Sequence, residues 1–465
     1  MSLRRPNGFI SAGYDPLEVP NAPTIGTAVS ASPTSVSVTF TAPANVGGSA
    51  ITGYVATAKK TSDGTTISGT GSSSPVTISG LTTGDAYTVT VAAVNSFGLG
   101  VSSAASNSVT PVESQLWSWG YNGNGQLGQN NTTSLSSPVQ VGALTTWYEI
   151  ITGGNFSCAI KNDGTIWTWG RNNVGQLGFD TSSNDRSSPV QVGALTTWYE
   201  IASASSGSCF ALKNDGSLWG WGSNSYGVLG LNDTANRSSP VQVGALTNWQ
   251  QVATSLHTLA VKSDGSLWGW GRNQFGCLGL NNTTYYSSPK QIGSLTTWYQ
   301  VSTGSLCSVA VKSDGTMWSW GRNSFGQLGL NDTDDRSSPV QIGSLTTWAK
   351  VSLTTVCVLA IKNDGSLWSW GYGGSGTNGT NDIINRSSPV QIGALTTWYD
   401  ISVMATAGFS IKNDNSLWGW GRNNEGQLGQ NSTTNRSSPV QIGSLTTWQK
   451  LAQGGGSHVL AIKTS

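Results

Sequence analysis

Charged residues are scarce in this chain of 465 residues: Asp, Glu, Lys and Arg together make up 10% of it, and the formal net charge is +1. Lys and Arg never form a run, so the sequence lacks the basic patch of a nucleic-acid-binding protein. No apolar stretch approaches the roughly 20 residues that cross a bilayer as a helix. We therefore expect neither a nucleic acid partner nor insertion into a membrane.

Histidine is rarer still, with two residues in the whole chain. Neither His257 nor His458 has a Ser or Cys nucleophile and a partnering acid in a recognisable order. Phosphate-cradling loops, HExxH sequences and EF-hand-type calcium loops are also missing. The acidic stretch 332–335 could hold a hard cation, but a solvated loop is the better interpretation. We expect a protein that is not an enzyme and has no cofactor and no metal.

Cysteine occurs five times, an odd number, and never as a Cys-x-x-Cys pair. These residues are therefore interpreted as buried free thiols of a protein made in a reducing cytoplasm. They are Cys158, Cys209, Cys277, Cys307 and Cys357.

Tryptophan, in contrast, is abundant, with 21 residues and none among the first 116. Fourteen of them form seven copies of Trp-x-Trp-Gly at steps of about 50 residues, and the other seven follow a Leu-Thr-Thr or Leu-Thr-Asn turn. A period of this size, combined with strand-like segments, predicts the blades of a β-propeller. The seven copies begin at Trp117, Trp167, Trp219, Trp268, Trp318, Trp368 and Trp418.

One repeating unit shows how a blade is expected to form. We expect strands at 189–193, 199–202, 209–213 and 217–222, with a hairpin turn at Asn214-Asp215-Gly216. A long loop then leads to the next unit. The repeat region opens with a fourth strand, 115–120, and finishes with a third strand, 457–463, so the two ends are expected to pair and close the ring.

The tryptophans have two interpretations. Side chains repeated at equivalent positions of a ring most simply pack between blades, and each buries a large apolar area. The alternative is a set of aromatic platforms for carbohydrate. Packing between blades is the favoured interpretation of the tryptophans.

The sequence Trp-x-Trp-Gly-Arg-Asn-x-x-Gly-Gln-Leu-Gly, as in 167–178, closely resembles the regulator of chromosome condensation repeat. Gly-Gln-Leu-Gly recurs at Gly125, Gly175, Gly326 and Gly426. The resemblance covers 114–465 and implies a seven-bladed β-propeller, in a family whose activities range from nucleotide exchange to inhibition and scaffolding. Family members often carry a His in the third expected strand. The matching positions here are Phe156, Ser208, His257, Cys307, Cys357, Ala407 and His458, for which packing is favoured over a soft-metal ring.

Residues 21–111 have a different composition, rich in Ser, Thr, Ala, Gly and Val. The alternation in 35–40 and 87–93 predicts half-buried strands. The segment 81–87, ending in Tyr87, resembles the tyrosine corner of a fibronectin type III domain, which implies a β-sandwich. The fold class is therefore all-β: a fibronectin type III-like sandwich followed by a seven-bladed propeller.

Residues 1–20 are expected to form an extended arm, because Pro6, Pro16 and Pro20 disfavour a helix and no apolar core of a secretion signal is present. The opening residues 1–12 resemble the start of structural proteins of cyanobacterial phages. Such an arm mixes charge with apolar side chains and can add to a partner's sheet edge. The candidate assembly anchors are Arg4, Arg5, Phe9, Ile10, Tyr14 and Leu17.

The units differ mainly in two zones, the turn before the third expected strand and the long loop between units. Both should emerge on one face of the ring, and loops on a rigid scaffold commonly carry binding residues. Undirected drift of the loops is the equally weighted alternative. The candidate partner-binding residues are Phe156, Phe179, Tyr285, Tyr286, Asp334, Asp335, Ile383 and Ile384.

These features lead to one functional hypothesis and one alternative. The hypothesis is a non-enzymatic virion structural protein, a fibre or decoration subunit made in the host cytoplasm and displayed on the virion surface. Residues 1–20 would bind other virion proteins, and the propeller would face a host surface glycan or protein, with a homo-oligomer also compatible. The alternative is an extracellular or cell-surface bacterial propeller for adhesion or inhibition.

Overall fold

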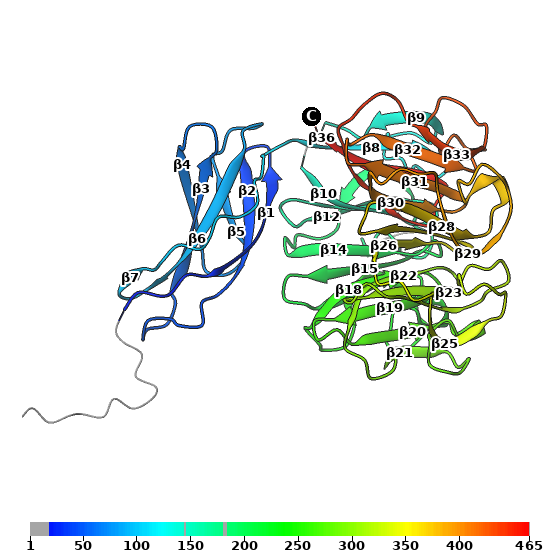
Figure 1. Ribbon diagram of the computed structural model, residues 1–465, viewed down its shortest axis with the longest axis horizontal. Helices are drawn as coiled ribbons and strands as arrows, with labels where there is room; N and C mark the ends of the chain where they lie inside the picture. The colour runs from blue at the N-terminus through cyan, green and yellow to red at the C-terminus, as the bar shows by residue number, and fades with distance from the viewer. Residues whose placement is uncertain (1–17, 144–145, 180–183, 465) are drawn as a thin grey trace, which may run out of the picture. The chain divides into compact units, whose positions relative to one another are not determined.

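The computed structural model describes residues 18–143, 146–179 and 184–464. The chain divides into two compact units, residues 1–114 and 115–465, which are described separately (Figure 1). Within the described residues, no helix combines the length and the apolar character that a membrane crossing requires.

The first unit contains two antiparallel sheets, one of three strands in the order β1-β2-β5 and one of four in the order β4-β3-β6-β7. Their strands are β1 (Thr24–Ser32), β2 (Ser35–Thr41), β3 (Gly53–Lys60), β4 (Thr66–Gly71), β5 (Val76–Ser79), β6 (Tyr87–Asn95) and β7 (Gly98–Leu99).

Side chains from both sheets form one core in this unit. Val36 from β2 and Val89 from β6 are fully buried in the same cluster, as the alternation of the sequence predicts. The Tyr87 hydroxyl accepts a hydrogen bond of 3.1 Å from the backbone N–H of Thr82, which is the contact expected of a tyrosine corner. The fibronectin type III relationship itself stays a prediction.

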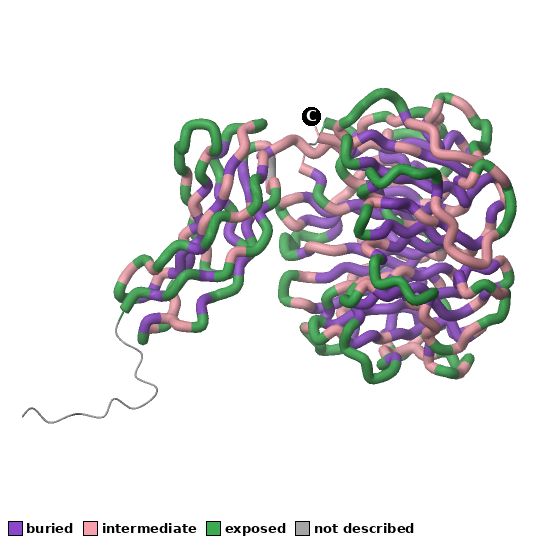
Figure 2. Tube along the Cα trace, viewed as in Figure 1, coloured by how far each residue is buried: buried purple, intermediate pink, exposed green. Residues whose placement is uncertain are grey.

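The second unit consists of seven four-stranded antiparallel sheets, one of which carries an additional short strand. Figure 2 shows buried residues along the strands and exposed ones in the loops of this unit. In each blade the first strand starts at the Trp of the Leu-Thr-Thr or Leu-Thr-Asn turn. The first strands are β10 (Trp147–Thr152), β14 (Trp198–Ser203), β18 (Trp249–Thr254), β22 (Trp298–Thr303), β26 (Trp348–Leu353), β30 (Trp398–Met404) and β34 (Trp448–Leu451), in blades 1 to 7.

The remaining strands follow in the same blade order. The second strands are β11 (Phe156–Lys161), β15 (Ser208–Lys213), β19 (His257–Lys262), β23 (Cys307–Lys312), β27 (Cys357–Lys362), β31 (Ala407–Lys412) and β36 (His458–Thr464). The third strands are β12 (Ile166–Gly170), β16 (Leu218–Gly222), β20 (Leu267–Gly271), β24 (Met317–Gly321), β28 (Leu367–Gly371), β32 (Leu417–Gly421) and β8 (Ser114–Gly120). The fourth are β13 (Arg186–Gln191), β17 (Arg237–Gln242), β21 (Tyr286–Gln291), β25 (Arg336–Gln341), β29 (Arg386–Gln391), β33 (Arg436–Gln441) and β9 (Leu135–Gln140).

The blade boundaries differ from those expected. The segment that begins near Pro189 was expected to open a blade, but it pairs with the third strand of the preceding unit, Trp167 opposite Gln191. It is therefore the outer strand, where a proline that cannot donate a hydrogen bond is tolerated. The long loop consequently lies within a blade, and the short Leu-Thr-Thr segment connects one blade to the next.

Both ends of the second unit share the closing blade, in the order β34-β36-β8-β9. The backbone N–H of Tyr121 donates to the carbonyl of Ser457 at 3.0 Å, which joins the two ends. The predicted closure is thus confirmed, although each end supplies two strands rather than one and three. A short strand, β35 (Gln453–Gly454), leaves this blade and pairs in parallel with β10. A side chain at Gly454 would lie 1.7 Å from the Thr152 carbonyl oxygen, so this approach requires glycine.

The second Trp of every Trp-x-Trp-Gly copy joins neighbouring blades. The indole of Trp169 donates to the carbonyl of Gln126 at 2.8 Å, and the six equivalent indoles make the same bond at 2.8–3.0 Å. All seven side chains are fully buried. The first Trp of each copy lies further out, where a Lys ammonium covers the ring in six blades within 4 Å and in blade 7 at 4.8 Å. These contacts agree with inter-blade packing.

Candidate functional site

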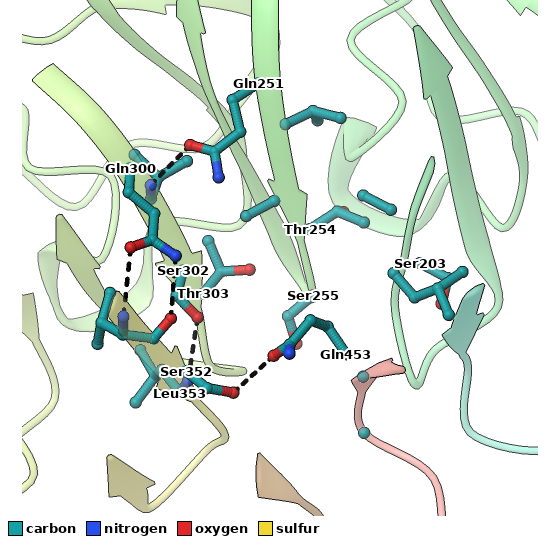
Figure 3. A pocket seen from close by; sticks show the side chains of 18 of the residues that line it. Ser203, Gln251, Thr254, Ser255, Gln300, Ser302, Thr303, Ser352, Leu353 and Gln453 are labelled. Atoms are coloured by element: carbon teal, nitrogen blue, oxygen red, sulfur yellow. Dashed lines mark hydrogen bonds between the residues drawn. The ribbon is translucent and has the colours of Figure 1, made fainter. Parts of the chain in front are cut away.

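A cavity of about 680 Å³ runs along the axis of the propeller and is lined by the first strands and the turns that follow them (Figure 3). Its walls combine Gln, Ser and Thr side chains with apolar ones.

Gln453 spans part of this cavity from the closing blade (Figure 3). Its Oε1 accepts a hydrogen bond of 2.8 Å from the Ser352 hydroxyl in blade 5, and its Nε2 donates to the Ile401 carbonyl in blade 6 at 2.7 Å. The side chain thus ties three blades together at the axis.

A belt of seven side chains, which we call the axial belt, surrounds the cavity two residues after each first-strand Trp. Where its members are acceptors, they bind the backbone of the next blade: Gln251 accepts from Val301 N at 2.9 Å and Glu200 from Val252 N at 3.3 Å. The belt therefore helps to connect blades. Its members are Glu149, Glu200, Gln251, Gln300, Lys350, Asp400 and Lys450.

Four of the five charges in the axial belt are paired. Lys350 contacts Asp400 with an N–O distance of 3.3 Å, and Lys450 forms an ion pair with Glu149. Among the described residues, Glu200 has no cation within ion-pair distance. Burial, opposed by the hydrogen bond from Val252 N and reinforced by the charge of Glu149, raises the pKa of Glu200 to about 8.

Tyrosines stand next to the axial belt, at the end of the cavity where the first strands begin. Tyr148, Tyr299 and Tyr399 are 41%, 63% and 50% exposed, and Tyr199 is half-buried. Lys350 Nζ lies 4.6 Å from the centroid of Tyr399, and Lys450 Nζ lies 5.4 Å from that of Tyr148. This end of the cavity therefore combines aromatic rings with carboxylates and ammonium groups.

The axial belt and its tyrosines were not among the residues predicted from the sequence. The signal was present, because the two positions after each Leu-Thr-Thr Trp vary between Tyr, Gln and Ala and between Glu, Gln, Lys and Asp. Only the pairing of the strands in the structure, however, shows that these positions meet around one axis.

The residues predicted to bind a partner lie on the opposite face, but not all are exposed. Phe156 was expected on that surface and is instead buried at 1% exposure, because the second strand of a blade is covered by neighbours on both sides. Phe179 and Tyr286 are half-buried. Tyr285 is 44% exposed and makes an edge contact with Tyr226, with ring centroids 5.6 Å apart.

The acidic and aliphatic members of the predicted set differ from each other. Asp334 and Asp335 are exposed, and the Asp335 carboxylate accepts from Asn323 N at 2.7 Å, so it supports the loop. Asp332, nearby, pairs with Arg336 at 2.6 Å. Ile383 and Ile384 are 69% and 57% exposed.

The two histidines are interior groups. His257 Nε2 lies 2.7 Å from the Ser308 hydroxyl, and His458 Nε2 lies 2.9 Å from the Ser157 hydroxyl. Burial lowers the pKa of both to about 3, so both are neutral near pH 7. No cluster of three potential metal-ligating side chains occurs in the segments 18–143, 146–179 and 184–464. The predicted anchors Arg4, Arg5, Phe9, Ile10, Tyr14 and Leu17 lie outside the described residues.

Comparisons with known proteins point to one family. The model of the RCC1-like domain matches residues 60–354, and that of the regulator of chromosome condensation (RCC1) repeat matches 414–462. Two similar proteins of Arabidopsis thaliana are the ultraviolet-B receptor UVR8, 29% identical over 31% of this chain and 34% of its own length, and the mitochondrial RCC1 domain-containing protein RUG3, 30% identical over 29% and 31%. The chain thus spans about a third of the length of the curated relatives it matches.

Solved structures share the architecture of the propeller. Human WBSCR16 superposes with a TM-score of 0.67 at 20% identity, over 76% of this chain and 99% of its own. Prp20p of Saccharomyces cerevisiae superposes with a TM-score of 0.67 at 18% identity, over 76% and 92%. At these identities the likeness establishes the fold.

Proposed function

Because this chain belongs to the family of RCC1-like domains, we propose that it is a non-enzymatic, protein-binding propeller. The partner surface in this proposal is the face that carries the loops between third and fourth strands, which we call the loop face. The yeast protein Prp20p, which shares the fold, is described as binding Gsp1p and histones, and one structure has it bound to Kap60. Those partners belong to Prp20p, and they support a protein as the class of partner here.

The observation that carries the proposal is a pair of exposed isoleucines on an ordered loop. The carbonyl of Ile384 accepts from the Asn378 amide at 3.1 Å, and its N–H donates to Asp382 at 3.1 Å. Asp382 is in turn paired with Arg386 at 2.5 Å. Such a frame presents Ile383 and Ile384 to solvent, and exposed apolar side chains on a rigid loop are what an interface buries.

We further propose that the protein is a virion structural protein, a fibre or decoration subunit on the virion surface. The arm, residues 1–20, anchors it to other virion proteins, and the propeller faces a host surface protein or glycan. The mixture of Arg4 and Arg5 with Phe9 and Ile10, and the resemblance of the first twelve residues to phage structural proteins, support this assignment. An extracellular bacterial adhesion or inhibitor protein is the alternative.

Two measurements test this proposal. Mass spectrometry of purified particles is expected to detect the chain at stoichiometric abundance, whereas recovery from bacterial surfaces without particles contradicts the virion assignment. Deleting residues 1–20 is expected to leave the propeller folded, by circular dichroism and thermal unfolding, but absent from particles. Full occupancy of the truncated protein on particles contradicts the anchor role.

A further inference from the structure

The axial belt contains the same two-residue arrangement three times. In blades 1, 2 and 6 the first-strand Trp is followed by a tyrosine and then by a carboxylate: Tyr148-Glu149, Tyr199-Glu200 and Tyr399-Asp400. All three pairs stand at the same position of the same strand, so each presents a ring and a carboxylate to the neighbouring blade.

Two of the three pairs receive an ammonium group from the blade that precedes them. Lys350 of blade 5 pairs with Asp400 at 3.3 Å and lies 4.6 Å from the Tyr399 ring centroid. Lys450 of blade 7 pairs with Glu149 and lies 5.4 Å from the Tyr148 ring centroid. Both distances to the rings are within the range of a cation–π contact, so ring and carboxylate act together on one ammonium.

The third pair, Tyr199-Glu200, has a different neighbour. The position that supplies Lys350 and Lys450 is occupied in the preceding blade by Glu149, which is already paired with Lys450. In the described part of the chain no ion pair includes Glu200. Tyr199 and Glu200 nevertheless line the axial cavity, together with Tyr148 and Glu149.

We propose that Tyr199 and Glu200 form a binding site for an external alkylammonium group, which enters the axial cavity and takes the place that a lysine takes in the two related pairs. The ring of Tyr148 borders the same part of the cavity. Its exposure of 41% leaves the site open at the end where the first strands begin.

The electrostatics of the site favour a cation over a neutral or anionic ligand. The charged members of the axial belt are three acidic side chains and two lysines, and Glu200 is the one without an oppositely charged partner. The groups that face it are Glu149 and Tyr148 of β10, Tyr199 of its own strand, Lys450 of β34 and the uncharged Gln251 of β18. Burial and the charge of Glu149 raise its pKa, so the free site holds a protonated carboxyl at neutral pH, and a bound ammonium releases that proton.

The test uses n-butylammonium as the free amine and an acetylated, amidated lysine peptide as the protein-borne form. The full-length chain is labelled with ¹³C-glutamate, which gives five carboxyl signals. The signal that is missing in Glu200→Gln is that of Glu200. Saturation with a probe at pH 7 is expected to shift the Glu200 signal to that of a carboxylate. Calorimetry of probe binding in two buffers measures proton release, and close to one proton should be released per bound ligand.

Glu200→Gln is a conservative variant, because Gln251 occupies the equivalent position in the next blade and accepts the same kind of backbone hydrogen bond from Val301. This variant is expected to abolish proton release and to weaken probe binding about tenfold, since it replaces a charge-assisted contact by a neutral one. Tyr199→Leu should also weaken binding. Tyr299→Leu, at a tyrosine followed by Gln300 rather than by a carboxylate, should leave binding unchanged.

The outcomes decide the proposal. Binding of butylammonium alone identifies a free amine as the ligand, and binding of both probes extends the site to a lysine side chain. A Glu200 carboxyl signal that ignores both probes overturns the proposal, as does equal binding by Glu200→Gln. Because these readouts need neither particles nor a protein partner, their failure leaves the proposed loop-face interaction standing.

Discussion

The indole Nε1 of Trp119 donates a hydrogen bond of 2.8 Å to the carbonyl oxygen of Gln427, which lies 308 residues later in the chain. Six other indoles make the same contact between sequential blades, but this one joins blade 6 to a strand from the start of the propeller. The contact therefore belongs to the closure of the ring as well as to its repeat.

Trp119→Phe is expected to destabilise the propeller by about 1–3 kcal/mol, because it removes a donor from a buried carbonyl. Urea unfolding followed by tryptophan fluorescence measures the change. Trp117→Phe removes the same atoms from a half-buried ring, whose Nε1 bonds only to the Gln115 side chain at 3.3 Å, and should cost less. Equal costs for the two variants contradict the special role of the Trp119 contact.

Deleting residues 457–465 is expected to unfold the propeller cooperatively, because β36 stands between β34 and β8 in the closing blade. Its loss separates the two ends and leaves two open sheet edges. Differential scanning calorimetry compares the truncated protein with one that lacks only Ser465. An unchanged melting temperature is incompatible with closure through this strand.

The spacing of the tryptophans was sufficient to predict the ring and the pairing of its ends, because both follow from one 50-residue pattern. The spacing was not sufficient to assign the strand that contains Pro189 to a blade, because a strand between two connections can pair with either neighbour. Only the pairing of Gln191 with Trp167 shows which neighbour it joins. Burial of Phe156 depends on blades covering both faces of β11. Lys450 and Glu149 are 301 residues apart and pair only after the ring has closed. Local sequence patterns therefore could not predict the axial belt.

All five cysteines are free and buried. Burial raises the pKa of Cys277 and of Cys357 to about 12, so their thiolates are scarce at neutral pH. A thiol reagent such as dithionitrobenzoate is expected to find none reactive in the native protein and five after denaturation. Metal analysis alongside should detect no stoichiometric zinc. A denatured count of three or one indicates a disulfide and contradicts the prediction.

The stability of the protein should depend on pH through Glu200. Its folded pKa, about 8, lies above the ordinary value of 4.5, so the folded state holds a proton that the unfolded state has lost between these values. The stabilisation from Glu200 is complete below pH 4.5 and is lost as pH rises through 8. Relative to the wild type, Glu200→Gln should therefore gain stability between pH 5 and 8, by an amount on the order of a few kcal/mol. A difference that stays constant with pH in urea unfolding argues against a buried, protonated carboxyl.

The double variant Ile383→Ser, Ile384→Ser is expected to abolish partner binding or adsorption while leaving the melting temperature unchanged, because both side chains are exposed. Leu345→Ser, Leu395→Ser is the matched control on the opposite face, where these leucines are 46% and 50% exposed. Pull-down or adsorption assays compare the two proteins. If only the control variant loses binding, the partner binds the opposite face and the proposed loop face is wrong.

The shared closing blade has a consequence for the time course of synthesis. Strand β8 leaves the ribosome early, while its partner β36 begins at His458, more than 300 residues later. At roughly 5–20 residues per second, translation leaves the edge of β8 without its partner for some tens of seconds. Once a leading chain on the same messenger has completed β36, that strand can pair with the open β8 edge of a trailing chain. The rate of elongation and the spacing of ribosomes thus become determinants of whether the product is a single ring or an entangled pair.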